Sequence, residues 1–386
     1  MPCNDSRQHV TIVDSTLRDG AQAPGVVLSA SHRLKIADLL IGAGLTDLDA
    51  GIPAMGPDEG KLLRTLTNRF PGKRIVAWCR ALPKDLDAAE KSGCCAVHIA
   101  FPLSELHLAS INRNHEWLFS SLAGLVGSAR HRFSFVSVGL IDATRADRSL
   151  LIRFCQRAEA VSADRVRLAD TVGILTPTKT ARLFNDLRSV VNLKKIDFHA
   201  HNDLGMATAN AVTAVDSGVG SISVTVNGLG ERAGNAALEE VAIALHLDGT
   251  IPCPLDLSKI QELCETVAGF SGRPIPPSKP VSGEAVFLHE SGIHWSGLLK
   301  DHRTFEPFSP SLTGHKLSAP VAGSHSGGAT VIALLRRSGM TLSTAEASLL
   351  AAKVRHRAIE LGRSLTIREV ERACIGQGGY PSPRRQ

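Results

Sequence analysis

Two histidines separated by one residue, His199 and His201, stand at the end of a short strand-like segment that begins at Ile196. Residues two apart on a strand project to the same side, so both imidazoles should face one way. Neutral imidazoles are common ligands of divalent metals. Taken alone, the pair fits two strand histidines bonded to nearby carbonyl groups equally well. The rest of the chain has to distinguish these alternatives.

Further polar residues stand at the ends of other strand-like segments or directly after them. They are Arg18, Asp19, Asp49, His107, Asp170, Thr171 and Asn227. Each could by itself cap a helix or form a turn. Because they recur at the same point of successive segments, a common site at one edge of the fold is the better interpretation.

The segments that must position these residues recur eight times along the chain. They are Val10–Asp14, Thr46–Gly51, Arg74–Cys79, Ala96–Phe101, Phe133–Ile141, Arg165–Asp170, Ile196–His201 and Ser221–Val226. Helix-like stretches such as His32–Gly42 and Leu150–Ser162 separate them. Eight strand-then-helix units predict a TIM barrel, whose chemistry lies at the carboxyl ends of its strands. An open doubly wound sheet is the alternative, but the first strand lacks the glycine-rich fingerprint of that fold.

Composition limits the class of protein. Hydrophobic residues make up 43% of the 386 residues, and no apolar run is long enough to cross a membrane. The polar first nine residues do not predict a signal peptide, and the eight cysteines lack C-x-x-C spacing, so we expect a cytoplasmic protein. The net charge of +6 is not arranged as a basic run with aromatics, which argues against nucleic-acid binding and suits anionic metabolites.

The repeat pattern stops after about Ile251, where prolines become frequent. We expect a barrel domain over residues 1–265, a linker and lid-like subdomain over 266–323, and a helical region over 324–386. The last stretch, 376–386, is rich in Gly, Pro, Ser and Arg and is predicted to be disordered. The fold class is therefore α/β: a TIM barrel followed by a smaller, mainly helical region.

Three motifs resemble the acyl-CoA-dependent synthases that include homocitrate and isopropylmalate synthases. They are Asp14–Gln22, His199–Gly205 and Val226–Ala236, and the resemblance extends from Thr11 to Gly323. Three further segments are most similar to the homocitrate synthases of nitrogen-fixing bacteria: Gly51–Gly56, Trp78–Arg80 and His289–Lys300.

The resemblance implies a Claisen-type condensation of acetyl-CoA with a 2-oxo acid, and 2-oxoglutarate is the expected acid. The product would then be homocitrate, used for the iron–molybdenum cofactor of nitrogenase, and the enzyme would be a homodimer. Two alternatives stay open. One is an isopropylmalate synthase-type enzyme that takes another 2-oxo acid. The other is a metal- and oxo-acid-binding homologue of low activity.

The resemblance also implies roles for individual residues. A divalent metal (Mg, Mn, Zn or Fe) would be bound by Asp19, His199, His201 and Asn235. Gln22, His107 and Thr171 would contact substrate. Arg18 would assist the developing oxyanion, and His294 would take part in proton transfer.

The chain departs from these relatives at two positions near the proton-transfer histidine. Ile141 stands where relatives carry Glu, and Phe305 stands where they carry Tyr. Neither Ile nor Phe can donate or accept a proton. Loss of an acid or base group costs about 10²–10⁴ in rate, so slow turnover is expected.

Overall fold

The structure, a computed structural model, describes residues 10–250 and 252–375. The chain forms two compact units, which meet in sequence between Ile275 and Pro276, and each is described by itself. The sequence predicted three regions with boundaries at residues 265 and 323, and this finer division stays a prediction. The predicted disordered tail lies outside the described residues.

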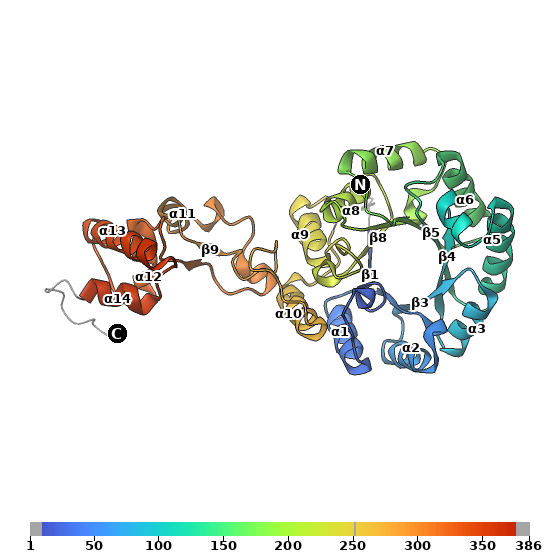
Figure 1. Cartoon of the computed structure of the whole chain (residues 1–386), viewed down its shortest axis with the longest axis horizontal. Helices are drawn as coiled ribbons and strands as arrows, with labels where there is room; N and C mark the ends of the chain where they lie inside the picture. Colours follow the sequence, from blue (N-terminus) through green and yellow to red (C-terminus); the bar gives the residue numbers. More distant parts are fainter. Residues whose placement is uncertain (1–9, 251, 376–386) are drawn as a thin grey trace, which may run out of the picture. The chain divides into compact units, whose positions relative to one another are not determined.

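The first unit is a closed barrel of eight parallel strands, which confirms the predicted TIM barrel (Figure 1). Closure is seen at β1, which pairs with both β2 and β8: Val13 lies opposite Asp47 on one side and Ser223 on the other. The strands are β1 Thr11–Asp14, β2 Asp47–Gly51, β3 Arg74–Arg80, β4 Ala96–Pro102, β5 Phe135–Ile141, β6 Arg165–Asp170, β7 Ile196–Ala200 and β8 Ser221–Val224.

Helices surround the strands and supply the outer layer of the core (Figure 1). They are α1 Ala30–Gly42, α2 Pro57–Arg69, α3 Pro83–Lys91, α4 Glu105–Ser110, α5 His115–Arg130, α6 Arg148–Ala160, α7 Pro177–Leu187, α8 Ala207–Asp216, α9 Leu238–Asp248 and α10 Ile260–Ser271. Local sequence explains several of their ends. Asn114 and Asp147 accept hydrogen bonds from the first turns of α5 and α6, and Gly249 ends α9 in the left-handed conformation.

Two strands end earlier than the sequence predicted. β8 stops at Val224 rather than Val226, because the chain turns sharply at Asn227, which has a φ of 58°. β7 stops at Ala200, and His201 instead forms an isolated antiparallel bridge with Asn235. Both changes bring the loop after β8 against the end of β7.

The second unit is mainly helical, as predicted. It contains the short strands β9 Leu288–His289 and β10 Ala319–Pro320 and the helices α11 Gly292–Leu298, α12 Gly328–Arg336, α13 Thr344–Leu361 and α14 Ile367–Ile375. A core that includes Leu335, Val354 and Val370 joins the last three helices. No helix in the described ranges is long and apolar enough to cross a membrane.

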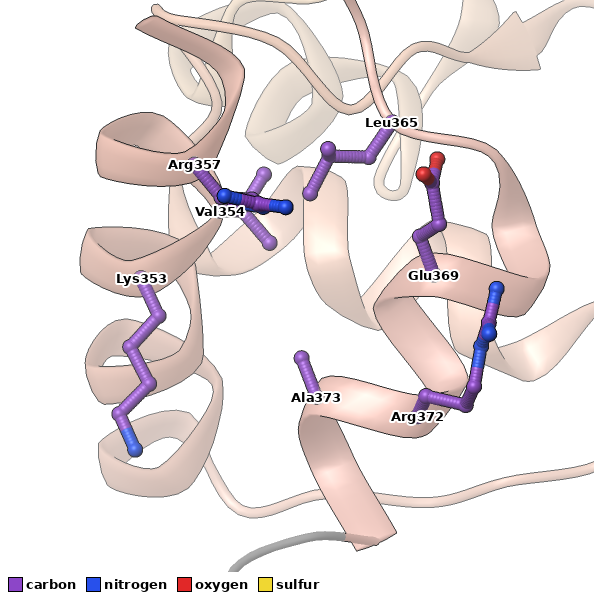
Figure 2. A pocket seen from close by; sticks show the side chains of 7 residues that line it. All are labelled: Lys353, Val354, Arg357, Leu365, Glu369, Arg372 and Ala373. Carbon is purple, nitrogen blue, oxygen red and sulfur yellow. The ribbon is translucent and has the colours of Figure 1, made fainter. Parts of the chain in front are cut away.

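A pocket of about 450 Å³ opens between α13 and α14, and its lining residues are shown in Figure 2. Val354 and Leu365 form part of its apolar wall, and Arg357 and Arg372 contribute charge. Glu369, which also lines it, is already paired with Arg363. Both arginines of the lining are exposed, so this pocket is a surface depression of the helical unit.

Candidate metal and substrate site

Asp19, His199 and His201 converge at the carboxyl end of the barrel. The Asp19 Oδ2 atom lies 3.6 Å from His199 Nε2 and 3.8 Å from His201 Nε2. One ligand atom from each residue lies within 4.8 Å of the others. The three residues are almost entirely buried. Asp19 follows β1, whereas His199 lies on β7 and His201 directly follows it, so the three come together because the barrel closes.

Hydrogen bonds to neighbouring groups orient two of these side chains, His201 and Asp19. His201 Nδ1 lies 3.1 Å from the carbonyl oxygen of Asp170, so its proton can be donated there and Nε2 left free as a ligand. Asp19 accepts from Arg18 Nη1 at 2.8 Å and from Asn235 Nδ2 at 2.7 Å. These two ligand candidates are therefore positioned by hydrogen bonds with three different parts of the chain, at Arg18, Asp170 and Asn235.

The protonation states suit metal binding. Burial favours the neutral carboxyl of Asp19, but Arg18 and the two histidines outweigh it and lower its pKa to about 2. Burial also lowers the pKa of His199 well below its usual value, with a further contribution from His201. At neutral pH the set therefore includes the carboxylate of Asp19 and the neutral imidazole of His199, which suit a divalent transition metal.

Asn235 adds a buried oxygen close to this set. Its Nδ2 donates to Asp19 and to the carbonyl oxygen of Leu229. Its Oδ1 is buried and has no hydrogen-bond partner among the described residues. An unpartnered buried oxygen beside two imidazoles and a carboxylate fits a metal, because the ion would satisfy it.

Glycines in the loop after β8 fix Asn235. Gly234 has a φ of 87°, and a Cβ there would lie 2.0 Å from the carbonyl oxygen of Gly228. The backbone N–H of Asn235 donates to that same carbonyl at 2.9 Å, and Asn202 N donates to Gly234 O at 2.8 Å. Only glycine permits so close an approach at this φ.

A buried network of ion pairs supports the site from inside the barrel. Asp49 Oδ2 accepts from Arg18 Nη2 and from Arg167 Nη1, both at 2.7 Å. Arg167 Nε also donates to Asp197 at 2.5 Å. Burial would raise the pKa of Asp49, but the two arginines hold it well below its usual range. Asp49, which was predicted to end a strand, lies within β2 and belongs to this buried network.

A cavity of about 200 Å³ adjoins the metal-ligand candidates. Among the residues predicted to bind substrate, Gln22 and Thr171 line it, and Arg18 does too. Trp78, His98 and Arg167 also line the cavity and were not predicted as site residues from the sequence. Arg167 could have been found from the spacing, because Arg165 and Arg167 stand two apart on one strand and so face the same side.

Two predicted site residues of the first unit, His107 and Asn235, are not among those that line this cavity. His107 lies on α4, where its Nδ1 is 3.1 Å from Asp142 Oδ2 and 3.1 Å from Ser104 Oγ. Asn235 does not line the cavity, although its Nδ2 donates to Asp19. The substrate contact assigned to His107 stays a prediction.

His294 belongs to the second unit, on α11. Its ring stacks on Phe305 with centroids 4.1 Å apart, and its Nδ1 lies 3.4 Å from His289 Nδ1. Phe305 therefore packs directly against the predicted proton-transfer group but offers it no hydrogen bond. The role of His294 stays a prediction.

Comparison with known proteins identifies the family. Residues 9–267 match the HMGL-like family, and residues 281–361 match the homocitrate synthase post-HMGL domain-like family. The chain belongs to the HMGL-like family. Its relatives confirm the predicted acyltransferase and the resemblance to homocitrate and isopropylmalate synthases.

Individual relatives carry different names. A 2-isopropylmalate synthase of Caldanaerobacter subterraneus subsp. tengcongensis is 42% identical, covering 94% of each chain. A homocitrate synthase of Frankia alni is also 42% identical, over 86% of this chain and 94% of the relative. An (R)-citramalate synthase of Methanocaldococcus jannaschii is 38% identical, over 82% of this chain and 65% of the relative. Similar identities to three differently named synthases leave the 2-oxo acid undecided.

Solved structures agree on the fold. The HMG-CoA lyase of Bacillus subtilis superimposes with a TM-score of 0.64 at 22% identity, covering 70% of this chain and 96% of that chain. The corresponding lyase of Pseudomonas aeruginosa gives a TM-score of 0.63, also at 22% identity, over 69% of this chain and 95% of that chain. At this identity the likeness concerns the barrel alone.

Proposed function

We propose that this protein condenses acetyl-CoA with a 2-oxo acid in a metal-dependent reaction, and that 2-oxoglutarate is the preferred acid. The products would be homocitrate and CoA. The observation that carries the proposal is the convergence of Asp19, His199 and His201 beside a cavity that Arg18 also lines. A homocitrate synthase at 42% identity supports the choice of substrate.

Asp19, His199 and His201 would hold the metal, with Asn235 Oδ1 as a further candidate ligand. When bound, a divalent ion supplies Lewis acidity that polarises the ketone of the 2-oxo acid. The protein's part is to present an ionised carboxylate, Asp19, and a neutral imidazole, His199, in a largely buried site. Both conditions are met by the burial and the ion pairs described above.

Arg18 would stabilise the negative charge that develops on the ketone oxygen. Its guanidinium is held by Asp49 and Asp19, so it is already oriented before substrate arrives. Thr171 would help to bind the acid: its Oγ1 accepts from the backbone N–H of Asp142 at 2.7 Å, which leaves its own proton available for a substrate oxygen. Gln22 lines the same cavity.

His294 would remove a methyl proton from acetyl-CoA. In this chain its ring contacts Phe305, and Ile141 occupies the position at the end of β5 where relatives carry Glu. Neither partner can relay the proton, so His294 would exchange it with water. Slow proton transfer with normal binding of the 2-oxo acid is the expected consequence.

A second candidate function is an isopropylmalate synthase-type reaction. The apolar side chains of the cavity, which include Trp78, Leu140 and Ile141, favour it, as does the relative of that name. If the first candidate function is right, the homocitrate would be used for nitrogenase cofactor synthesis. The enzyme would be a homodimer located in the cytoplasm.

The deciding experiment measures thiol release from acetyl-CoA by purified protein with 2-oxoglutarate, 2-oxoisovalerate and pyruvate. The protein is first stripped with a chelator and then supplied with Mg²⁺, Mn²⁺, Zn²⁺ or Fe²⁺. We expect release only after metal is restored, and the highest kcat/KM with 2-oxoglutarate. A higher kcat/KM with 2-oxoisovalerate would select the second candidate.

A matched pair of variants tests the metal site itself. His199→Ala should bind metal at least about tenfold more weakly by calorimetry and lose metal-dependent activity. His246→Ala removes an exposed histidine on α9 and should change neither. Equal metal affinity in His199→Ala and the unchanged protein would remove the basis of the proposed function.

A further inference from the structure

His98 on β4 lies in the barrel interior, and the mechanism above gives it no role. It is 2% exposed, and its Nδ1 lies 2.9 Å from Ser137 Oγ on the neighbouring strand β5. It lines the same cavity as Asp19, His199 and His201. A polar side chain buried in a substrate cavity is a candidate for substrate recognition.

The position of β4 places His98 opposite the metal-ligand candidates. In the closed order of strands, β8 stands between β7 and β1, which carry or precede those ligands, and β4 is the strand furthest from β8. A molecule whose ketone lies at the ligands and whose chain crosses the cavity would therefore approach His98 with its far end.

The ring is turned toward β5 and leaves one nitrogen unused. An added Cβ at Gly139 would lie 2.3 Å from His98 Nε2, so a side chain at position 139 would displace the ring. Among the described residues Nε2 has no hydrogen-bond partner. The Ser137 hydroxyl can donate to Nδ1, which leaves the ring proton on Nε2.

The arginines of the cavity are less available. Arg18 is bound to Asp49 and Asp19, and Arg167 is bound to Asp49. Arg232 is bound through two nitrogens to Asp203. Burial, with a contribution from Arg167, lowers the pKa of His98 well below its usual value and keeps the ring neutral. A neutral ring with Nε2–H is a hydrogen-bond donor, and this one has no partner among the residues that the structure describes.

We propose that His98 Nε2–H donates to the distal carboxylate of the 2-oxo acid and so selects a dicarboxylic over a monocarboxylic substrate. The assignment rests on the proposed function, because it names the residue that chooses the substrate of that reaction. An N–H donor at this position would form a hydrogen bond with the distal carboxylate of a dicarboxylic acid. It would stay unpaired when the acid carries a methyl group instead of that carboxylate.

The test compares 2-oxoglutarate with 2-oxopentanoate, which has a methyl group in place of the distal carboxylate. Binding of each acid is measured by calorimetry in the presence of Mg²⁺, and kcat/KM by thiol release. His98→Leu should weaken 2-oxoglutarate about ten- to hundredfold, the loss expected for one hydrogen bond to a charged group, mostly in KM. Its effect on 2-oxopentanoate should be less than about threefold. His98→Gln, which keeps an N–H donor, should retain most of the preference.

An equal loss for both acids in His98→Leu, or unchanged affinity for both, would overturn the assignment. If His98→Leu does not fold, the folded His98→Gln variant replaces it. Full loss of its preference for 2-oxoglutarate over 2-oxopentanoate would then overturn the assignment. If His98→Leu selectively weakens the binding of 2-oxoglutarate but the protein releases no CoA, the assignment of His98 is confirmed and the proposed reaction is wrong. If the protein releases CoA but His98→Leu does not selectively weaken 2-oxoglutarate binding, the proposed reaction is confirmed and the assignment of His98 is wrong.

Discussion

Arg167 on β6 and Asp49 on β2 form a buried ion pair across the barrel, with Nη1 and Oδ2 2.7 Å apart although the residues are 118 positions apart in sequence. The same carboxylate oxygen accepts from Arg18, which in turn contacts the ligand candidate Asp19. Buried ion pairs inside the barrel therefore hold Arg18 in position beside the ligand candidates at the carboxyl ends of the strands. A change at Asp49 should reach the site without touching substrate.

We expect Asp49→Asn to lower the free energy of unfolding by about 3–5 kcal/mol, because two buried arginines lose their shared counter-charge. Activity should fall as well, since Arg18 loses the group that orients it. Urea unfolding and thiol release measure the two effects. Asp38→Asn, which disrupts a largely exposed pair with Arg69, is the control and should matter far less. Similar losses of stability and activity in the two variants would show that the buried ion pairs of Asp49 contribute no more than an exposed pair.

Gly234→Ala should destabilise the protein by about 2–3 kcal/mol, because position 234 combines a φ of 87° with a carbonyl oxygen 2.0 Å from the added Cβ. Since Gly234 precedes Asn235, metal affinity should fall too. Gly127→Ala on α5 meets nothing within 4 Å and should instead stabilise by about 0.5–1 kcal/mol. Thermal unfolding with and without metal distinguishes the two. Wild-type stability in Gly234→Ala would contradict the argument.

Asp14 predicts a specific pH dependence of stability. Burial raises its pKa from 3.8 to about 7, although hydrogen bonds from Thr16 oppose the shift. The folded state then binds more protons than the unfolded state between about pH 4 and pH 7, so this group's contribution to stability falls as pH rises through that window. Asp14→Asn should remove the effect. From pH 4 to pH 7 the wild type should therefore lose stability relative to Asp14→Asn, as measured by the free energy of unfolding. A difference between the two proteins that does not change with pH would refute this role of Asp14.

Restoring the missing proton-transfer partners should raise turnover. Ile141→Glu with Phe305→Tyr is expected to increase kcat while the affinity for the 2-oxo acid stays nearly constant. The two changes should be non-additive, because both would act through His294 in the proposed reaction. Steady-state kinetics of the single and double variants measure this.

Ile141→Glu alone needs a stability control, because a carboxylate at the half-buried end of β5 lacks a partner. Thermal unfolding of each variant supplies it. Unchanged kcat in a stably folded double variant would show that these positions do not limit the rate, and would put the role of His294 in doubt.

Local sequence was sufficient for the fold class and for much of the site. Eight strand-like segments separated by amphipathic stretches predict a barrel, and spacing by two predicts that His199 and His201 face one way. The ends of β7 and β8 were predicted less well, because the bridge between His201 and Asn235 depends on contacts remote in sequence.

The sequence by itself determined which residues share a face: Asp47 with Asp49, Arg165 with Arg167, and Asp197 with His199, each pair two apart on a strand. Only the tertiary structure decided that these faces meet in one lumen, where Arg167 binds Asp49 and Asp197. It also decided that His98 faces the ligand candidates from the opposite wall. Period-two alternation gives a side of a strand, whereas barrel closure and strand stagger decide which sides face one another and at what height.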